Sequence, residues 1–319
     1  MKPEYFLGID TSNYTTSLAV ISADGELLLN AKRPLTVEKG ARGLRQSEAV
    51  FAHVKNLPSL WEEAEAVLST GRLAAVGVSM TPRHQAGSYM PCFLSGVAAA
   101  TSAATAAGVP LYRFSHQCGH LAAAILSSGR YDLFDRPFGA FHVSGGTTEA
   151  LLVTPNKDKS DFDIELVGET KDINAGQAID RVGVMMGLAF PCGRELERLA
   201  ASFEGKIEKR RICVSEGSCS LSGVENIATK MYMDTEDKQA VAAFVFDFIC
   251  RTLREMTDQI LEKYGEMPVL YAGGVMSNKL MRSALAKDRD AHFAEAEFSA
   301  DNAAGVALLA RLRALAEVD

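Results

Sequence analysis

Two histidines, His116 and His120, lie four residues apart at the start of a helical pattern, HQCGHLAAAILSS. At that spacing both rings project from one face of a helix. Such a pair suits two ligands of a single divalent or iron ion. The alternative is a partly buried pair whose nitrogens are satisfied by water or backbone carbonyls. A third ligand would have to come from elsewhere in the chain.

The remaining candidates for metal binding are weaker. Asp301, in the run SADN, stands at the expected N-cap of the last helix, so helix capping is its ordinary role. His142 lies in an expected strand and His292 near one, which favours structural roles for both. His53 and His84 are left without an assigned role.

Three turns that follow expected strands could hold phosphate groups. Backbone N–H groups at such turns point toward anions, and glycine lets the chain approach them closely. One such turn is usually only a turn, but three at matching positions predict nucleotide binding. Their residues are Asp10, Thr11 and Ser12; Val143, Ser144, Gly145, Gly146 and Thr147; and Gly273 and Gly274.

The elements that would position these residues follow one order twice. In the first half we expect strands at Tyr5–Ile9, Ser17–Ser22 and Glu26–Arg33, a helix at Ser47–Leu68, a strand at Ala74–Met80, a helix at Phe93–Ala107 and a strand at Pro110–Ser115. Pro58 is expected to kink or split the first of these helices.

The second half repeats the three-strand opening. Its expected strands lie at Phe138–Ser144, Glu149–Thr154, Asp163–Glu169, Arg211–Ser215, Pro268–Ala272 and Ala291–Ala294. Its expected helices lie at Ala175–Leu188, Arg194–Phe203, Asp237–Lys263, Asn278–Lys287 and Asn302–Ala316.

This order predicts an α/β fold with two duplicated βββαβα lobes around a nucleotide cleft, the plan of actin, sugar kinases and Hsp70. We expect residues 1–115 to form the first lobe and residues 116–300, beginning with the histidine helix, to form the second. The last helix, residues 301–319, is expected to pack back between the lobes.

Composition narrows the functional classes. The net charge of −7 argues against unaided nucleic-acid binding, and the basic run Lys206–Arg211 is best read as a solvated edge. The six cysteines include no CxxC pair, which argues against a zinc ribbon or a disulfide framework. No stretch is apolar enough to span a membrane and no secretion signal is visible, so we expect a cytoplasmic protein.

Seven segments, in order, resemble motifs of the tRNA threonylcarbamoyltransferase family, formerly described as sialoglycoprotein endopeptidases. HQCGH is similar to the family's HMEGH, and HVSGGTTEALLV to VSGGHTxL. The other matches are GIDTSNYTTSLAV to GIETSCDETxxAV, GQAIDRVGVMMGL to GEAFDKxxxLLGL, FPCGRELERLA to YPGGPxxxxxA, AGGVMSNKLMR to AGGVxANxxLR, and SADNAAGVALLA to TDNGAMIAxAG.

The resemblance implies an acyltransferase. Its metal ligands would be His116, His120 and Asp301, which would hold one divalent ion, iron or zinc. The residues contacting the nucleotide or acyl intermediate would be Ser144, Gly145, Gly146, Asp180, Gly193 and Asn278, with Asp180 on a ribose hydroxyl. The ligand would be ATP, AMP or threonylcarbamoyl-AMP, and the acyl group would pass to N6 of the adenosine beside the tRNA anticodon. The resemblance also implies that helper proteins take part, namely a smaller paralogous subunit and an ATPase subunit. The chain would form a homodimer or a heterodimer.

The chain departs from the family pattern at several positions, which indicates a divergent paralog. Thr147 replaces a histidine, Cys192 replaces a glycine, and Asn13-Tyr14 replaces an acidic pair. The loop Thr81–Gly87 lacks the family's Gly-Pro-Gly turn, and a serine-glycine motif is reduced to Leu221-Ser222-Gly223.

These departures leave other functions open. One is carbamoyl transfer to a small molecule, since carbamoyltransferases with a similar domain keep the metal motif. Others are ATP phosphotransfer, although no loop aspartate stands out as a base, and a nucleotide-binding scaffold without tRNA-modifying activity. Peptidase activity is disfavoured because the sequence contains no HExxH.

Overall fold

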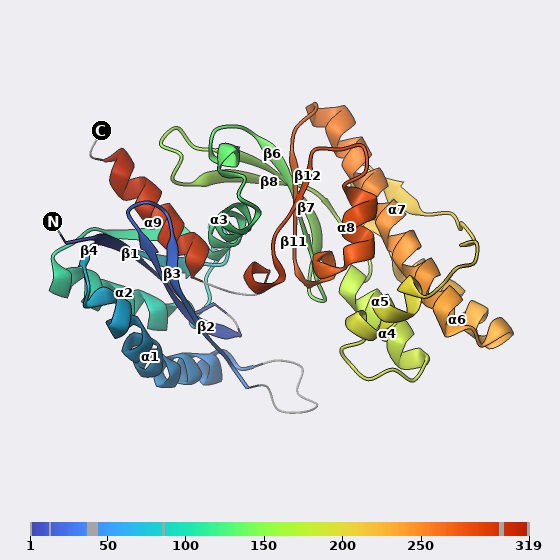
Figure 1. The fold of residues 1–319 in the computed structure, drawn as a ribbon, viewed down its shortest axis with the longest axis horizontal. Helices are drawn as coiled ribbons and strands as arrows, with labels where there is room; N and C mark the ends of the chain where they lie inside the picture. The colour runs from blue at the N-terminus through green and yellow to red at the C-terminus, as the bar shows by residue number, and fades with distance from the viewer. Residues whose placement is uncertain (1, 13, 37–43, 85–86, 300–302, 318–319) are drawn as a thin grey trace. The chain divides into compact units, whose positions relative to one another are not determined.

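The computed structural model describes residues 2–12, 14–36, 44–84, 87–299 and 303–317. The chain divides into two compact units (Figure 1). The first unit comprises Met1–Arg136, Pro155–Asp163 and Ala300–Asp319, and the second comprises Pro137–Thr154 and Ile164–Ser299.

A five-stranded mixed sheet forms the centre of the first unit. Its strand order is β3-β2-β1-β4-β5. The meander β1–β2–β3 is antiparallel, whereas β4 and β5 run parallel to β1, so β1, β4 and β5 end at the same edge. The strands are β1 (Glu4–Asp10), β2 (Thr15–Ser22), β3 (Leu27–Pro34), β4 (Arg72–Thr81) and β5 (Leu111–Ser115).

Four α-helices belong to the first unit: α1 (Gln46–Leu68), α2 (Phe93–Ala107), α3 (His116–Ser128) and α9 (Ala304–Ala316). The apolar core between the sheet and α1 and α2 contains Leu7, Ile9 and Leu60. Helix α1 continues as one helix through Pro58, so the predicted split does not occur.

Helix α9 packs directly on the strands of the first unit, red against blue in Figure 1. A Cβ added to Gly8 of β1 would lie 2.4 Å from the Ala303 carbonyl oxygen, so the backbones touch there. A Cβ on Gly305 would likewise lie 1.9 Å from the Gly119 carbonyl oxygen of α3. Because of this packing, the first compact unit continues through α3 to Arg136, beyond the lobe boundary expected at residue 115.

The second unit repeats the same sheet. Its strand order, β12-β11-β6-β7-β8, corresponds strand for strand to that of the first unit, which confirms the duplicated plan. Strand β7 is antiparallel to β6, and β11 runs parallel to both β6 and β12. The strands are β6 (Phe138–Val143), β7 (Thr148–Pro155), β8 (Phe162–Glu169), β11 (Val269–Ala272) and β12 (Ala291–Phe293).

Helix α7 (Lys238–Tyr264) is the main core helix of the second unit, with 15 buried residues among its 27. The sheet side of this core includes three stacked rings from adjacent strands. Phe141 lies 5.0 Å from Tyr271, and Tyr271 lies 5.3 Å from Phe293, measured between ring centroids. Such stacking fixes the strand register.

Shorter elements complete the second unit. They are α4 (Ala175–Met185), α5 (Gly193–Ala201), the hairpin β9 (Cys213–Ser215) and β10 (Ser218–Ser220), α6 (Ser222–Thr235) and α8 (Lys279–Leu285). Three short 3₁₀ turns occur at η1 (Tyr131–Phe134), η2 (Gly274–Ser277) and η3 (Ala296–Phe298). The sequence prediction omitted α6 and β10. Among the described residues, no helix has the length and apolar character needed to cross a membrane.

Candidate functional site

The strand ends of the first unit gather around one buried carboxylate. Asp10, the last residue of β1, is fully buried. Its side chain accepts a hydrogen bond from the Ser12 backbone N–H at 2.7 Å and a second from the Ser79 hydroxyl on β4. It also bonds Nδ1 of His116, just after β5, at 2.8 Å. Parallel strands that end at one edge therefore bring three distant segments together.

The surroundings of Asp10 keep it ionised. Burial raises the pKa of its carboxyl group, but the charge and hydrogen bond of His116, with the bonds from Ser12 and Ser79, outweigh burial and lower the pKa below its usual value. When the ring is neutral, a proton on His116 Nδ1 would be donated to Asp10, which would leave Nε2 as the ligand atom.

The two predicted histidine ligands are neighbours. The ring centroids of His116 and His120 are 4.2 Å apart at an interplanar angle of 72°. The N-terminus of α3 that carries them is capped by the Ser115 hydroxyl, which accepts from the Cys118 N–H at 3.2 Å. A carboxylate behind a ligating histidine is the usual outer support of a protein metal site, so these residues fit a divalent ion. Asp301, the predicted third ligand, lies outside the described residues.

The other residues of the first predicted turn have separate roles. The Thr11 hydroxyl donates to the Cys92 carbonyl at 3.0 Å and accepts from the Gly96 N–H at 2.9 Å, so it braces the start of α2. The Ser12 hydroxyl is buried and has no hydrogen-bond partner within the described part of the chain. Thr11 is thus committed to the fold, whereas Ser12 retains an unused donor.

The second predicted turn presents backbone rather than side chains. The Ser144 hydroxyl accepts from the N–H groups of Gly146 and Thr147, at 3.2 and 3.0 Å, and shapes the turn. A Cβ added to Gly145 or Gly146 would meet open space. A Cβ on Gly176 would instead lie 2.6 Å from the Gly145 nitrogen, so the N-terminus of α4 abuts the turn. The N–H groups of Ser144, Gly146 and Thr147 already have acceptors, as do those of Ala175, Gly176 and Gln177 in the first turn of α4, so the turn offers open space rather than a set of free donors.

The third predicted turn lies beside the second. Strand β11 is parallel to β6, with Ala272 opposite His142, so both turns leave the same sheet edge. Gly273 has φ of +100°, and a Cβ there would lie 2.3 Å from the Val143 carbonyl oxygen. Only glycine suits this position. Gly274 follows it and faces open space.

Asp180 and Asn278 both cap helices. One oxygen of Asp180 accepts from the Cys192 N–H at 2.8 Å, just before α5 and its first residue, Gly193. The Asn278 side chain accepts from the Met281 N–H at 2.9 Å at the start of α8. Asp180 also lines a cavity of about 490 Å³ together with Gln177, Arg181, Val184, Met185, Phe190 and Glu225.

Cys192, which replaces a family glycine, is accommodated by a second glycine. A Cβ on Gly183 of α4 would lie 2.2 Å from the Cys192 Cβ, so the cysteine side chain occupies the space that Gly183 leaves. Burial raises the pKa of the Cys192 thiol, and the nearby negative charge of Asp180 raises it further. The thiol therefore packs as a small apolar group rather than as a nucleophile.

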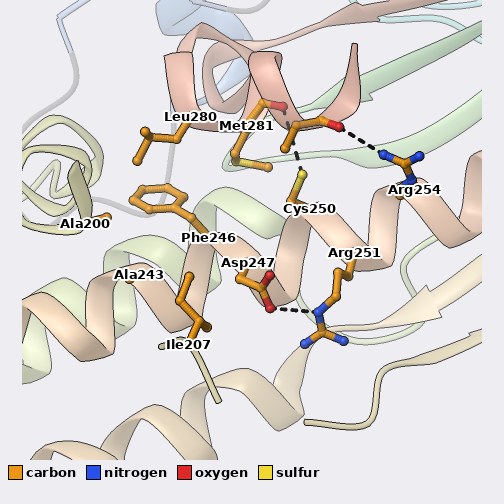
Figure 2. Close-up of a pocket in the computed structure, with 11 residues that line it drawn as sticks. Ala200, Ile207, Ala243, Phe246, Asp247, Cys250, Arg251, Arg254, Leu280 and Met281 are labelled. Carbon is orange, nitrogen blue, oxygen red and sulfur yellow. Dashed lines mark hydrogen bonds and ion pairs between the residues drawn. The ribbon is translucent and has the colours of Figure 1, made fainter. Parts of the chain in front are cut away.

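Another cavity of the second unit, about 340 Å³ in volume, lies between α7 and α8 (Figure 2). None of the predicted site residues lines it. Its charged groups are paired within its own wall: Arg251 bonds Asp247 at 2.7 Å, and Arg254 donates to the Ala284 carbonyl at 3.2 Å. Much of the remaining wall is apolar, although the Cys250 thiol also lines it and Nη2 of Arg251 has no hydrogen-bond partner among the described residues.

The sequence prediction missed one cluster in the first unit. His84, Cys118 and Asp161 bring one ligand atom each to within 4.8 Å of one another. Nε2 of His84 lies 3.2 Å from Oδ1 of Asp161, and this hydrogen bond raises the pKa of His84. The three residues are far apart in the sequence, so no spacing signal could reveal them.

The duplicated sheets, with turns at their parallel strand ends, define the class of actin-like and sugar-kinase folds. Among solved structures, the chain is similar to full-length HypF in its phosphate- and nucleotide-bound form, with a TM-score of 0.59, 13% identity and coverage of 98% of this chain and 46% of that one. A glucokinase of the ROK family from Streptomyces griseus gives a TM-score of 0.53 at 11% identity, covering 96% of this chain and 99% of that chain. At such identities the likeness shows the fold alone.

Sequence relatives are more specific. A model of tRNA N6-adenosine threonylcarbamoyltransferases matches residues 32–308. An enzyme of that name from Streptococcus pneumoniae (strain Taiwan19F-14) is 32% identical over 299 residues, covering 90% of this chain and 85% of its own. The equivalent from Streptococcus gordonii has the same identity and coverage. The chain belongs to the tRNA N6-adenosine threonylcarbamoyltransferase family, a family of transferases.

Proposed function

We propose that this chain transfers a threonylcarbamoyl group from threonylcarbamoyl-AMP to N6 of the adenosine beside the tRNA anticodon. Family membership supports the reaction type. The observation that carries the proposal is the Asp10–His116 hydrogen bond, because it orients one of two adjacent histidines as a metal ligand requires.

In this proposal His116 and His120, completed by Asp301, hold one iron or zinc ion. The ion, when bound, supplies Lewis acidity toward the acyl carbonyl. Asp10 keeps the proton on His116 Nδ1, and burial of Asp10 keeps water away from that hydrogen bond. Ser12 contributes its unused hydroxyl to the bound acyl-nucleotide.

The second unit would hold the adenylate. The glycine turn Ser144–Thr147, in which Gly145 and Gly146 face open space, would border the phosphate, which leaves with AMP as an anion. Gly274 would extend this cradle, and the oxygen of Asp180 that does not bond Cys192 would accept from a ribose hydroxyl. Gly193 and Asn278 would position the helices that border the nucleotide.

A partner protein is part of the proposal. The net charge of −7 is unfavourable for binding tRNA alone. Helix α1 exposes Phe51 and Val54, at 71% and 55% of their surface, and α2 exposes Leu94 at 52%. Exposed apolar side chains of this size on neighbouring helices favour a protein interface, such as one with a smaller paralogous subunit.

The deciding experiment supplies the purified chain with synthetic threonylcarbamoyl-AMP and unmodified tRNA, with and without candidate helper subunits. We expect AMP release to match the formation of modified adenosine in the tRNA. Release of AMP without tRNA modification would contradict the proposal and would instead support a small-molecule acceptor. No AMP release in any combination would support a nucleotide-binding role without transfer.

A further inference from the structure

The cluster of His84, Cys118 and Asp161 combines nitrogen, sulfur and oxygen donors of the kinds that bind zinc-like cations. The three residues come from separate segments of the first unit: the loop after β4, the first turn of α3, and the Pro155–Asp163 segment. Cys118 is fully buried, Asp161 is partly buried, and His84 is half exposed. Solvent and ions can therefore reach the cluster through the histidine side.

This cluster lies on the other side of α3 from the histidine pair. Successive residues of a helix are rotated by about 100°. Cys118 is two residues from each histidine, so its side chain points about 160° away from both. On that side of the helix the Cys118 thiol donates to the Phe162 carbonyl at 4.0 Å. The carboxylate of Asp161 lies close to the same thiol. A metal held there would be separate from one held by His116 and His120.

The donor distances are close to those of a tetrahedral site. Zinc bonds of about 2.0–2.3 Å place pairs of ligand atoms roughly 3.3–3.6 Å apart. The His84 nitrogen and the Asp161 oxygen are 3.2 Å apart, and all three donors lie within 4.8 Å. Side-chain shifts would be needed to bring all three atoms to bonding positions, and the fourth position would be left for water.

Two of the three residues occur where the chain departs from its family's motifs. Cys118 is the middle residue of HQCGH, where the family motif HMEGH has glutamate. His84 lies in the loop that lacks the family's Gly-Pro-Gly turn. Two departures that are 34 positions apart in the sequence thus meet at one point of the fold.

We propose that His84, Cys118 and Asp161 form a second divalent-cation site, of the zinc class. The site ties the loop after β4 to α3 and to the Pro155–Asp163 segment. Its metal is distinct from the one that the histidine pair would hold.

Cobalt binding by the full chain tests this proposal. In a His116→Ala and His120→Ala double variant the predicted family metal cannot bind, so any Co²⁺ that remains reports the new cluster. We expect one Co²⁺ per chain with a thiolate-to-cobalt charge-transfer band in the near ultraviolet. Adding Cys118→Ser should abolish the band and weaken Co²⁺ binding by more than about tenfold.

Cys213 provides the matched control because it is an exposed cysteine in the second unit. Cys213→Ser in the same double variant should leave the band unchanged. A second arm uses His84→Ala, a half-exposed position that the fold tolerates, which should also weaken Co²⁺ binding by more than about tenfold. The proposal is overturned if the double variant binds no Co²⁺, or if the band survives Cys118→Ser or is lost with Cys213→Ser.

Discussion

The strand ends of the two units share one plan but use different chemistry. In the first unit, β1, β4 and β5 end at side chains: Ser79 and His116 both bond Asp10, and the three are largely buried. In the second unit, the matching strands β6 and β11 end at glycine turns whose backbone faces open space. The same strand order thus ends in buried, hydrogen-bonded side chains in one unit and in exposed glycine turns in the other.

This contrast teaches which substitutions matter in each unit. Where side chains do the chemistry, removing atoms should be damaging. In the glycine turns of the second unit, adding even a single Cβ should be damaging, because the glycine positions define the shape of the turn. The predictions below test this difference, beginning with the largest expected effect.

Removing both histidine rings should have the largest effect. His116→Ala with His120→Ala should abolish the bound metal and lower the transfer rate by about 10³-fold, equivalent to about 4 kcal/mol of transition-state stabilisation. Metal analysis and AMP release measure the two losses. His292→Ala is the control, since that ring lies in the second unit, where it bonds Asp290. An unchanged metal content would refute metal binding by His116 and His120.

Adding one methyl group beside the glycine turn of the second unit should weaken nucleotide binding. In Gly176→Ala the new Cβ would lie 2.6 Å from the Gly145 nitrogen and must push the turn aside. A displacement of about 1 Å typically costs about 10²-fold, so we expect nucleotide affinity to fall by that factor in calorimetric titration with AMP. Gly223→Ala, which meets nothing within 4 Å, should leave affinity unchanged. Equal affinities in both variants would contradict the backbone role.

A substitution at Asp10 tests how much its hydrogen bond to His116 contributes to metal affinity. Asp10→Asn keeps the shape of the side chain but removes the charge that orients His116. Outer-shell changes of this kind cost about 10–100-fold in metal affinity. Competition with a metal chelator measures the loss, and Asp24→Asn, at an exposed turn of the same unit, serves as the control. If affinity is retained, Asp10 is a purely structural residue.

Asp172 should show a smaller, pH-dependent effect on the second unit. Its carboxylate accepts from the N–H groups of Leu221 and Ser222 and from the Ser222 hydroxyl, so it caps α6. Burial raises the pKa of Asp172, but these bonds outweigh it and lower the pKa below 3.8. Asp172→Asn should therefore reduce the free energy of unfolding by about 1 kcal/mol at neutral pH, a typical capping value.

The sign of the pH dependence follows from the lowered pKa. The unfolded chain takes up the proton first as pH falls, so the stabilisation by Asp172 is complete above 3.8 and is lost as pH falls through the lower folded value. Urea unfolding should therefore show the two proteins converging in acid. A constant difference at all pH values would mean that the charge of Asp172 does not contribute.

Much of this fold could be predicted because its elements carry strong periodicity. The expected Asp237–Lys263 helix and the observed α7 (Lys238–Tyr264) differ by one residue at each end, since apolar residues recur along its whole length. Helix α6 was missed because only Val224 and Ala228 are buried along it, so its apolar face is too thin to detect. Pro58 was expected to kink or split α1, and the helix is not split, since it continues from Gln46 to Leu68 with Pro58 inside it.

The site was predictable only where residues lie close in sequence or follow a family motif. His116 and His120 form one pair because a helical spacing brings them together, as expected. The bonds from Asp10 to His116 and to Ser79 span more than 60 positions and depend on the parallel strand order. The same holds for His84, Cys118 and Asp161, which only the folded chain brings together.

The packing of α9 on β1 has a consequence for how the protein is made. Residues 304–316 complete a layer against strands at residues 4–10 and 72–81, through contacts as close as that of Gly8 with Ala303. During synthesis the early strands leave the ribosome long before the helix that covers them. The second unit comprises residues 137–154 and 164–299, all of which precede α9 in the chain. The packing of the first unit, which contains the histidine pair, can therefore be completed only once the C-terminal helix has been synthesised.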